Sequence, residues 1–319
     1  MINSTLAFVF PGQGSQSLGM MSDLAASFPV VNETFAEASD VLGYDLWQLT
    51  QQGPEQDLNQ TDRTQPAMLA AGVAAWRIWQ TQTQVTPATM AGHSLGEYTA
   101  LVCSGAIGFA DAVDLVADRG RFMQQAVPAG SGAMAAILGL DDDQVRAVCV
   151  ESAQDEVVAA VNFNSPGQVV IAGHVAAVNR AMDAAQAAGA KRALALPVSV
   201  PSHCSLMQPA ADKMQAKLAT IKITAPNIPV INNVDVTAIA TADGISDVLV
   251  RQLYQPVRWV ETIQSMATNG INTIVECGPG KVLAGLNKRI DRSMTALPLF
   301  DSASLQKVLE TIATAEETS

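Results

Sequence analysis

Short apolar runs alternate with longer amphipathic segments along most of the chain. Thr5 to Phe10 and Val85 to Met90 are apolar or β-branched and are predicted to be buried strands. This alternation is typical of an α/β protein with a parallel sheet. Pro66 is expected at a first helical position, where its missing N–H is not needed. Early helices are predicted at Met20 to Phe28, Val30 to Leu42, Leu46 to Gln52, Pro66 to Gln80 and Phe109 to Val127.

The pattern changes after residues 128–132, which form a linker by composition. Beyond it the predicted order is strand, helix, strand, strand, helix, strand, which is the order of a ferredoxin-like unit. The elements are Ala133 to Leu138, Asp141 to Ala153, Val157 to Phe163, Gln168 to Ala172, His174 to Ala188 and Arg192 to Leu196. The sequence therefore predicts a large α/β domain, residues 1–127 and 197–319, and a small inserted domain, residues 128–196.

Strands and helices alternate again in the last third of the chain. The turn from Glu276 to Lys281 could hold an anion at a helix start, although a tight strand-to-helix turn is the simpler interpretation. The predicted elements are Leu206 to Thr220, Val230 to Asn232, Asp243 to Leu253, Trp259 to Asn269, Thr273 to Val275 and a helix from Ser302.

Composition and charge exclude several classes of function. The chain has 319 residues, of which 49% are hydrophobic and 15% charged, so it can bury a large core. Its net charge of −12 and its lack of clustered Lys and Arg argue against nucleic-acid binding and against docking on anionic membranes. No run is long enough to span a membrane, and no signal segment is recognised. We expect a cytoplasmic protein, and a monomer, because no long apolar stripe indicates an obligate partner.

Neither a cofactor nor a metal is expected. The glycine loop from Pro11 to Gln16 lacks the G-K-[ST] ending of a phosphate-binding loop, and its glycines do not give G-x-G-x-x-G. The cysteines form no C-x-x-C pair and are expected to be reduced and partly buried. Cys204 is the one alternative nucleophile among them, because it follows His203. The cysteines are Cys103, Cys149, Cys204 and Cys277.

The most informative motif is Gly92-His93-Ser94-Leu95-Gly96, a match to G-x-S-x-G. In that motif a serine sits on a sharp strand-to-helix turn, and glycines let the backbone bend without a Cβ clash. The predicted strand upstream of Ser94 and the helical spacing downstream fit this context. A plain glycine turn with a serine helix cap is the alternative. The pattern alone leaves both open.

A serine needs a base to act as a nucleophile at neutral pH. The chain has three histidines. His93 adjoins Ser94, but neighbouring side chains at a tight turn diverge. His174 falls in the small domain, where a surface role is expected. His203 follows a segment stiffened by two prolines beside the large domain, and it is the best candidate for the base.

Arg119 interrupts the apolar stripe of its predicted helix. Val116 lies one turn before it and Met123 one turn after it, so its side chain should face the interior or a cleft. A guanidinium there requires an anionic partner. A buried carboxylate of the protein and a substrate carboxylate are equally good candidates. Arg121 lies on the other side with Asp118 and is expected in an ordinary solvated pair.

Taken together and in this order, these residues closely resemble the malonyl-CoA:acyl carrier protein transacylases of bacterial fatty acid synthesis. The resemblance covers nearly the whole chain and shows no departure at positions that the family uses for chemistry. It is carried by Phe10 to Gln16, Gly92 to Tyr98, Arg119, Asn162 to Gln168, Pro197 to His203, Gln252 and Gly278 to Gly280.

The resemblance implies a role for each of these residues. Ser94 would be the acylated nucleophile and His203 its base, with the backbone carbonyl of Gln252 orienting the imidazole. Backbone N–H groups of Gln13 and Leu95 would form the oxyanion hole. The implied fold is an α/β-hydrolase-like core with an inserted ferredoxin-like subdomain.

The implied reaction is a ping-pong transfer of a malonyl group from malonyl-CoA to the phosphopantetheine thiol of holo-acyl carrier protein. Arg119 would bind the malonyl carboxylate. A serine thioesterase or esterase and a non-catalytic carrier-binding protein are the competing hypotheses. Because carrier proteins of this kind are acidic, docking needs a local basic surface. Its candidates are Lys191, Arg192, Lys213, Lys217 and Lys222.

Overall fold

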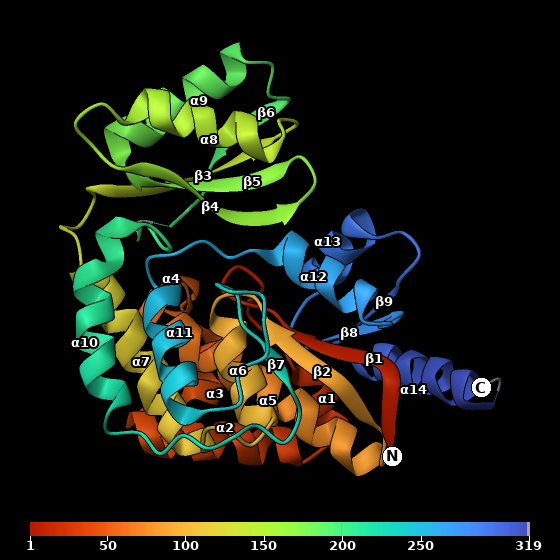
Figure 1. Ribbon diagram of the computed structural model, residues 1–319. Coiled ribbons are helices and arrows are strands. Elements are labelled where there is room, and N and C mark those ends of the chain that lie inside the picture. The colour runs from red at the N-terminus through yellow and green to blue at the C-terminus, as the bar shows by residue number, and fades with distance from the viewer. Residues whose placement is uncertain (199, 318–319) are drawn as a thin grey trace.

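A computed structural model describes residues 1–198 and 200–317, and it contains two separate β-sheets (Figure 1). The first is a five-stranded sheet with the order β7-β2-β1-β8-β9, and all its paired strands are parallel. Its strands are β1 (Ile2–Phe10), β2 (Thr86–Gly92), β7 (Val230–Ile231), β8 (Thr273–Cys277) and β9 (Thr295–Leu299). The predicted α/β class with a parallel sheet is confirmed.

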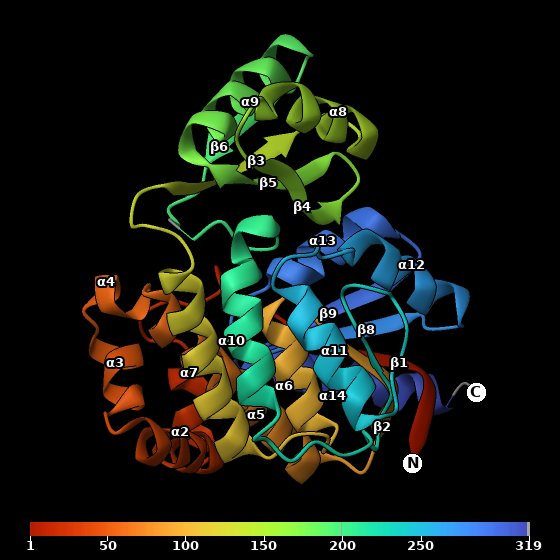
Figure 2. The ribbon, with the colours of Figure 1, turned by 60° about the vertical axis from the view of Figure 1, so that its left-hand side comes forward.

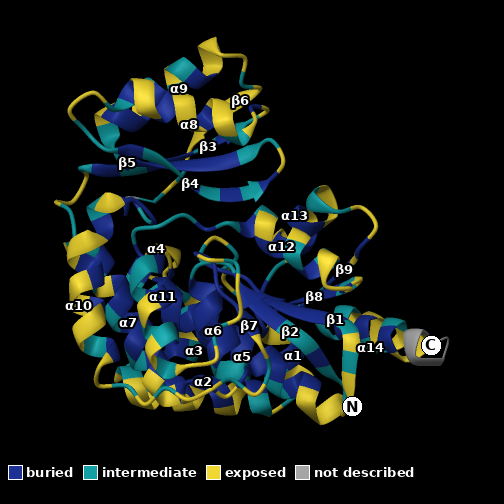
Figure 3. Cartoon of the chain, in the orientation of Figure 1, coloured by how far each residue is buried: buried dark blue, intermediate teal, exposed yellow. Residues whose placement is uncertain are grey.

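The central strand β1 is buried on both faces. Leu6, Phe8 and Phe10 belong to the core that contains α5 (Thr61–Gln82) and α6 (Leu95–Cys103). Ala7 and Val9 point the other way, into a core formed with α12 (Trp259–Thr268) and α13 (Val282–Ile290). Because successive side chains of a strand alternate between its faces, one apolar strand can support helices on both sides. Figure 3 shows these strands as the buried centre of the larger part.

The other helices surround this sheet. Figure 2 shows α10 lying beside α7 and α11, and α7 also packs against α5. Their bounds are α1 (Ser22–Ser27), α2 (Val30–Leu42), α3 (Leu46–Gln52), α4 (Glu55–Leu58), α7 (Phe109–Gln125), α10 (Gln208–Leu218), α11 (Ala242–Gln252) and α14 (Ser302–Glu317), with a 3₁₀ turn at Ser205–Met207.

The second sheet has four strands in the antiparallel order β4-β5-β3-β6. This order and the helix crossovers are those of a ferredoxin-like unit, as the sequence predicted. Helices α8 and α9 cover its outer face, where Ile137, Phe163 and Ile171 are buried. The elements are β3 (Gly132–Leu138), α8 (Asp142–Ala153), β4 (Val158–Ser165), β5 (Gln168–His174), α9 (Val175–Ala187) and β6 (Arg192–Ala195).

The inner face of the second sheet lies against the larger part. Val161 and Val170 pack there with Cys204, which follows the segment returning to the large sheet. Backbone hydrogen bonds join Phe163 N–H to Val257 O at 3.0 Å and Val257 N–H to Val161 O at 2.8 Å. Strand β4 is therefore fixed above the carboxyl ends of the parallel strands. The domain boundaries at residues 128 and 196 remain a prediction.

Most predicted elements agree with the structure to within a few residues, but the start of one helix differs and some short elements were not predicted. Pro66 does not begin its helix, because α5 starts at Thr61, where Thr61 and Thr64 of the first turn are buried. Helix α4 and strand β9 were not predicted from the sequence. Among the described residues, no helix is long and apolar enough to cross a membrane.

Candidate active site

Ser94 lies at the sharp turn between β2 and α6. Its φ of 51° and ψ of −107° are unusual for a residue with a side chain. The turn is too tight for larger neighbours: a Cβ on Gly92 would lie 1.8 Å from the carbonyl carbon of Gly96, and one on Gly96 would lie 2.0 Å from Phe10 O. The glycines of the motif are therefore required by backbone contact, and the predicted strand–turn–helix context is present.

His203 faces Ser94 from a loop on the other side. Ser94 Oγ lies 2.7 Å from His203 Nε2, and His203 Nδ1 lies 2.7 Å from the carbonyl oxygen of Gln252. A carbonyl can only accept a hydrogen bond, so Nδ1 carries the proton and Nε2 is free to accept from the serine hydroxyl. The geometry brings the sequence-predicted nucleophile, base and orienting carbonyl together.

The environment keeps His203 neutral. The residue is only 3% exposed, and burial, followed by the positive charge of Arg119, lowers the pKa of its imidazole to about 3. A neutral imidazole is the form that can accept a proton from serine.

Arg119 is buried and points at the same hydroxyl. Its Nη2 donates to Ser94 Oγ at 3.2 Å and to Gln252 Oε1 at 3.0 Å, and its Nη1 donates to Gln65 Oε1 at 2.9 Å. No carboxylate among the described residues lies within ion-pair distance of this guanidinium. The sequence left two possible partners for Arg119, a carboxylate of the protein and a carboxylate of the substrate. The described structure shows no protein carboxylate in direct contact with it. Arg121 pairs with Asp118 at the surface, as predicted.

Glu97 and Asn233 complete a buried network that the sequence analysis missed. Asn233 Oδ1 accepts from the N–H of Ser94 at 2.7 Å, and its Nδ2 donates to Gly92 O at 2.7 Å. Glu97 Oε2 accepts from Asn233 N–H at 2.9 Å and from Gln252 Nε2 at 2.8 Å. Burial raises the pKa of Glu97 to about 7. The network holds both sides of the serine turn against the loop after β7.

Backbone N–H groups of Gln13 and Leu95 are available beside the serine. Neither donates a hydrogen bond to any part of the chain that the structure describes. Leu95 is the first residue of α6, where amides lack helical partners. The Gln13 loop touches the serine turn, since a Cβ on Gly12 would lie 2.5 Å from His93 O.

A cavity of about 440 Å³ joins these groups. It lies between the serine turn and the segment that leaves β6, so both parts of the fold contribute to it. Met123 and Met134 add apolar surface. The polar residues lining it are Gln13, Gln16, Asn59, Thr61, His93, Ser94, Arg119, Asn162, Ser202 and His203.

The alternatives considered for the base and the nucleophile have other partners. His93 Nε2 lies 2.8 Å from Asn164 Oδ1, and His174 Nδ1 accepts from Val157 N–H at 3.0 Å. Cys204 is buried, and burial raises the pKa of its thiol to about 11. All four cysteines are free thiols. No group of three or more potential metal ligands is found within residues 1–198 and 200–317.

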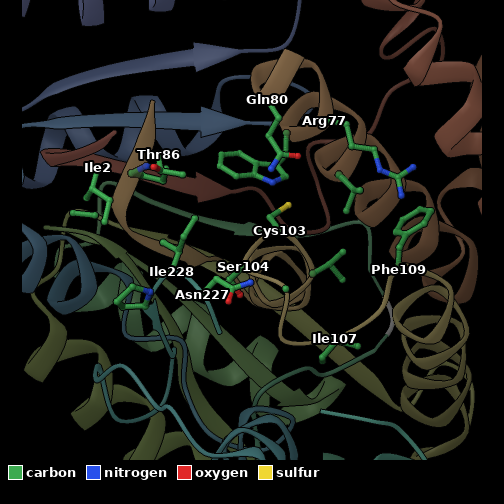
Figure 4. A pocket seen from close by; sticks show the side chains of 17 residues that line it. Ile2, Arg77, Gln80, Thr86, Cys103, Ser104, Ile107, Phe109, Asn227 and Ile228 are labelled. Atoms are coloured by element: carbon green, nitrogen blue, oxygen red, sulfur yellow. The ribbon is translucent and has the colours of Figure 1, made fainter. Parts of the chain in front are cut away.

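A second cavity, of about 580 Å³, shares no lining residue with the first and lies between α5, the start of β2 and the turn before α7 (Figure 4). Arg77, the cation at one end, is already bound to Glu37 and to the hydroxyl of Thr34, both at 2.9 Å. Every buried side-chain nitrogen or oxygen among its lining residues has a hydrogen-bond partner. This cavity therefore shows no polar group that awaits a ligand.

The candidate docking residues differ in their surroundings. Lys191, just before β6, and Arg192, its first residue, are exposed and precede the segment that lines the site cavity. Lys217 is bound to Asp114 at 2.5 Å and to Asp118 at 2.8 Å. Among the described residues, Lys191 and Arg192 form no ion pair, whereas Lys217 forms two.

Comparison with known proteins gives consistent results. Residues 7–304 match the acyl transferase domain family. The chain is 62% identical over 304 residues to the malonyl CoA-acyl carrier protein transacylase of Escherichia coli strain K12, covering 95% of this chain and 98% of that protein.

Solved structures of related proteins resemble this chain in both sequence and fold. An acyl carrier protein S-malonyltransferase from Vibrio cholerae is 59% identical, with a TM-score of 0.93 over 95% of this chain and 99% of that one. A malonyl-transacylase in complex with a type II PKS acyl-carrier protein is also 59% identical, with a TM-score of 0.95 over 96% and 99% of the two chains. The chain therefore belongs to the acyl transferase family and, within it, to the malonyl CoA-acyl carrier protein transacylases.

Proposed function

We propose that the protein transfers a malonyl group from malonyl-CoA to the phosphopantetheine thiol of acyl carrier protein, supplying fatty acid elongation, by way of a malonyl ester on Ser94. The observation that carries this proposal is the convergence of two groups on one hydroxyl. His203 Nε2 can take its proton, and the guanidinium of Arg119, which has no carboxylate within ion-pair distance in the described chain, lies 3.2 Å from the same oxygen. A nucleophile beside a buried cation suits an acyl group that bears a carboxylate.

In the first half-reaction Ser94 Oγ attacks the thioester carbonyl while its proton passes to His203 Nε2. The resulting oxyanion is held by the N–H groups of Gln13 and Leu95. The C–S bond then breaks, and His203 returns the proton to the departing CoA sulfur. A Gln252 carbonyl can fix the imidazole tautomer, although it stabilises the imidazolium less than a carboxylate would.

In the second half-reaction the carrier-protein thiol takes the place of CoA. His203 accepts the thiol proton, the sulfur attacks the ester carbonyl, and the C–O bond to Ser94 breaks with return of the proton to Oγ. Losing one oxyanion donor typically slows such reactions by about 100- to 1000-fold. Throughout both steps Arg119 holds the malonyl carboxylate and so fixes the acyl group.

The test is incubation with a panel of acyl-CoAs, read by intact mass and by transfer to holo-acyl carrier protein. Malonyl-CoA should give a malonyl adduct that Ser94→Ala abolishes, and carrier protein should discharge it. An adduct retained by Ser94→Ala would place the nucleophile elsewhere. Release of free malonate at the same rate with and without carrier protein would indicate a hydrolase instead.

We also propose that the enzyme acts as a monomer in the cytoplasm. In support, the exposed large apolar side chains of the described residues lie scattered over separate elements. They are Met1, Ile2, Leu18, Val41, Val150, Leu194 and Val282. Sedimentation or light scattering at micromolar concentration tests the monomer.

A further inference from the structure

Arg119 is held in place by neutral oxygens. Its Nη1 donates to Gln65 Oε1 and its Nη2 to Gln252 Oε1, at 2.9 and 3.0 Å. Arg119 is 2% exposed, Gln65 is 1% exposed and Gln252 is fully buried. A buried guanidinium is ordinarily paired with a carboxylate, because an unpaired buried charge is costly. Here amide oxygens accept from its two terminal nitrogens, its Nε–H has no hydrogen-bond partner among the described residues, and its charge stays in place.

The closest buried carboxylate is kept one group away. Glu97 contacts Gln252 Nε2 at 2.8 Å, while Oε1 of the same amide faces Arg119. The amide orientation is fixed, because Arg119 can only donate and the Ser94 carbonyl, 3.0 Å from Nε2, can only accept. Glu97 thus lowers the cost of burying Arg119 without occupying its N–H groups.

Gln65 acts on this arrangement from outside the cavity. It comes from α5, does not line the cavity, and its Nε2 faces Met123 Sδ at 3.6 Å. Its one strong polar contact is therefore the Arg119 guanidinium. A carboxylate of the same shape at this position would form a buried ion pair with Arg119 and would compete with any incoming anion.

We propose that Gln65 is a specificity-determining positioning residue, whose uncharged side chain aims Arg119 at Ser94 while keeping the positive charge available to the carboxylate of the acyl group. This inference rests on the proposed function. It predicts that charge at position 65, and not shape, controls the preference for carboxylated acyl groups.

The test compares malonyl with acetyl transfer in Gln65→Glu and Gln65→Met. For Gln65→Glu we expect kcat/KM for malonyl-CoA to fall by about 100-fold or more, since like charges placed together are strongly unfavourable, while acetyl transfer changes little. Gln65→Met should slow both substrates by a similar factor and keep their ratio. Gln80→Glu, the same change at an exposed position of α5, is the matched control and should behave as wild type.

Should Gln65→Glu fail to fold, Gln65→Glu combined with Glu97→Gln carries the test. This double variant keeps the number of buried carboxylates constant and moves one into contact with Arg119; Glu97→Gln alone is its reference. The proposal is overturned if Gln65→Glu leaves the ratio of malonyl to acetyl kcat/KM unchanged. It is also overturned if Gln65→Met lowers that ratio as much as Gln65→Glu does. Failure of the proposed function would appear separately, as absence of malonyl transfer in the wild-type protein.

Discussion

His203 is predicted to work as a base over an unusually wide pH range. Burial, and then the positive charge of Arg119, lower its pKa to about 3, so the neutral imidazole persists well below the ordinary value of about 6.5. We therefore expect the rate of Ser94 malonylation to show no loss due to His203 between about pH 8 and pH 5. Rapid quenching followed by intact mass measures this rate directly.

The variant Glu97→Gln is the control for this pH experiment. The pKa of Glu97 is raised to about 7, so it changes charge in the same range. Because the pKa of Glu97 is higher in the folded than in the unfolded state, its protonated form stabilises the fold at low pH. This contribution to stability is lost as the pH rises from about 4.5 to 7. A rate change near pH 7 that disappears in Glu97→Gln belongs to Glu97. A loss of malonylation rate centred near pH 6.5 that persists in Glu97→Gln would contradict a neutral His203.

Arg119→Ala should separate binding of the carboxylate from chemistry at the serine. The guanidinium makes hydrogen bonds to Ser94, Gln65 and Gln252, and its charge has no carboxylate within ion-pair distance in the described chain. We expect kcat/KM for malonyl-CoA to fall by about 100-fold or more, because a charged hydrogen-bonding partner is lost, and acetyl transfer to fall far less. Arg121→Ala on the same helix is the matched control. Equal losses for both acyl groups would refute the assigned role.

Local sequence was sufficient for some of these residues and not for others. Ser94 stands in a recognisable motif, and Arg119 stands out because a cation on an apolar stripe needs a partner. Glu97, Asn233 and Gln65 act through contacts between distant segments, which a single sequence does not display. The one available signal for Gln65 was a polar residue beside the apolar part of α5, and such residues also occur at ordinary helix surfaces.

At the scale of elements, the turn between β2 and α6 requires glycine at positions where a side chain would collide with the backbone. A Cβ on Gly96 would lie 2.0 Å from Phe10 O, so Gly96→Ala must displace α6 from β1. We expect a loss of stability of about 1–3 kcal/mol or more and loss of the acyl-enzyme. Gly285→Ala, at an exposed position of α13 where no other part of the chain lies within 4 Å of the new Cβ, should instead stabilise by about 0.5–1 kcal/mol. Thermal unfolding of both variants measures the contrast, and equal effects would contradict it.

The order of elements followed from the sequence because apolar periodicity is a local property. Strand β1 illustrates this, since its continuous apolar run reflects burial on both faces. Helix α4 and strand β9 were missed because each is short and is fixed by neighbouring structure. The turn after β8 proved to be a tight strand-to-helix connection. Glu276 accepts from the N–H groups of Leu283 and Ala284 at 3.0 and 2.7 Å, so a carboxyl group of the chain itself occupies the start of α13.

At the scale of the molecule, the site exists because two parts of the fold meet. The parallel sheet supplies Ser94 and the amides beside it, and the four-stranded sheet closes the cavity from above through Met134 and Asn162. His93 on the serine turn and Asn164 on β4 lie 2.8 Å apart and couple the two parts. We therefore expect the carrier-protein thiol to enter along their junction.

The family resemblance implies an acidic carrier protein, and we expect its docking at this junction to use Lys191 and Arg192. Both are exposed at the start of β6, which continues into the cavity-lining segment Leu196 to Val198. Reversing both charges to Glu should raise the carrier-protein KM by roughly 10-fold with little change in kcat, because long-range attraction is lost while the catalytic groups stay in place. The wild-type KM should also rise with salt, and that of the variant should respond less.

Two controls make this result specific to docking. Ser94 malonylation by malonyl-CoA, measured without carrier protein, should show an unchanged maximal rate in the doubly reversed variant. Lys307→Glu places a reversed charge on α14, away from the junction in Figure 1, and should leave the carrier-protein KM near the wild-type value. An unchanged KM after reversal of Lys191 and Arg192 would exclude this surface, because an acidic partner that approaches an enzyme of net charge −12 must find local positive charge where it binds.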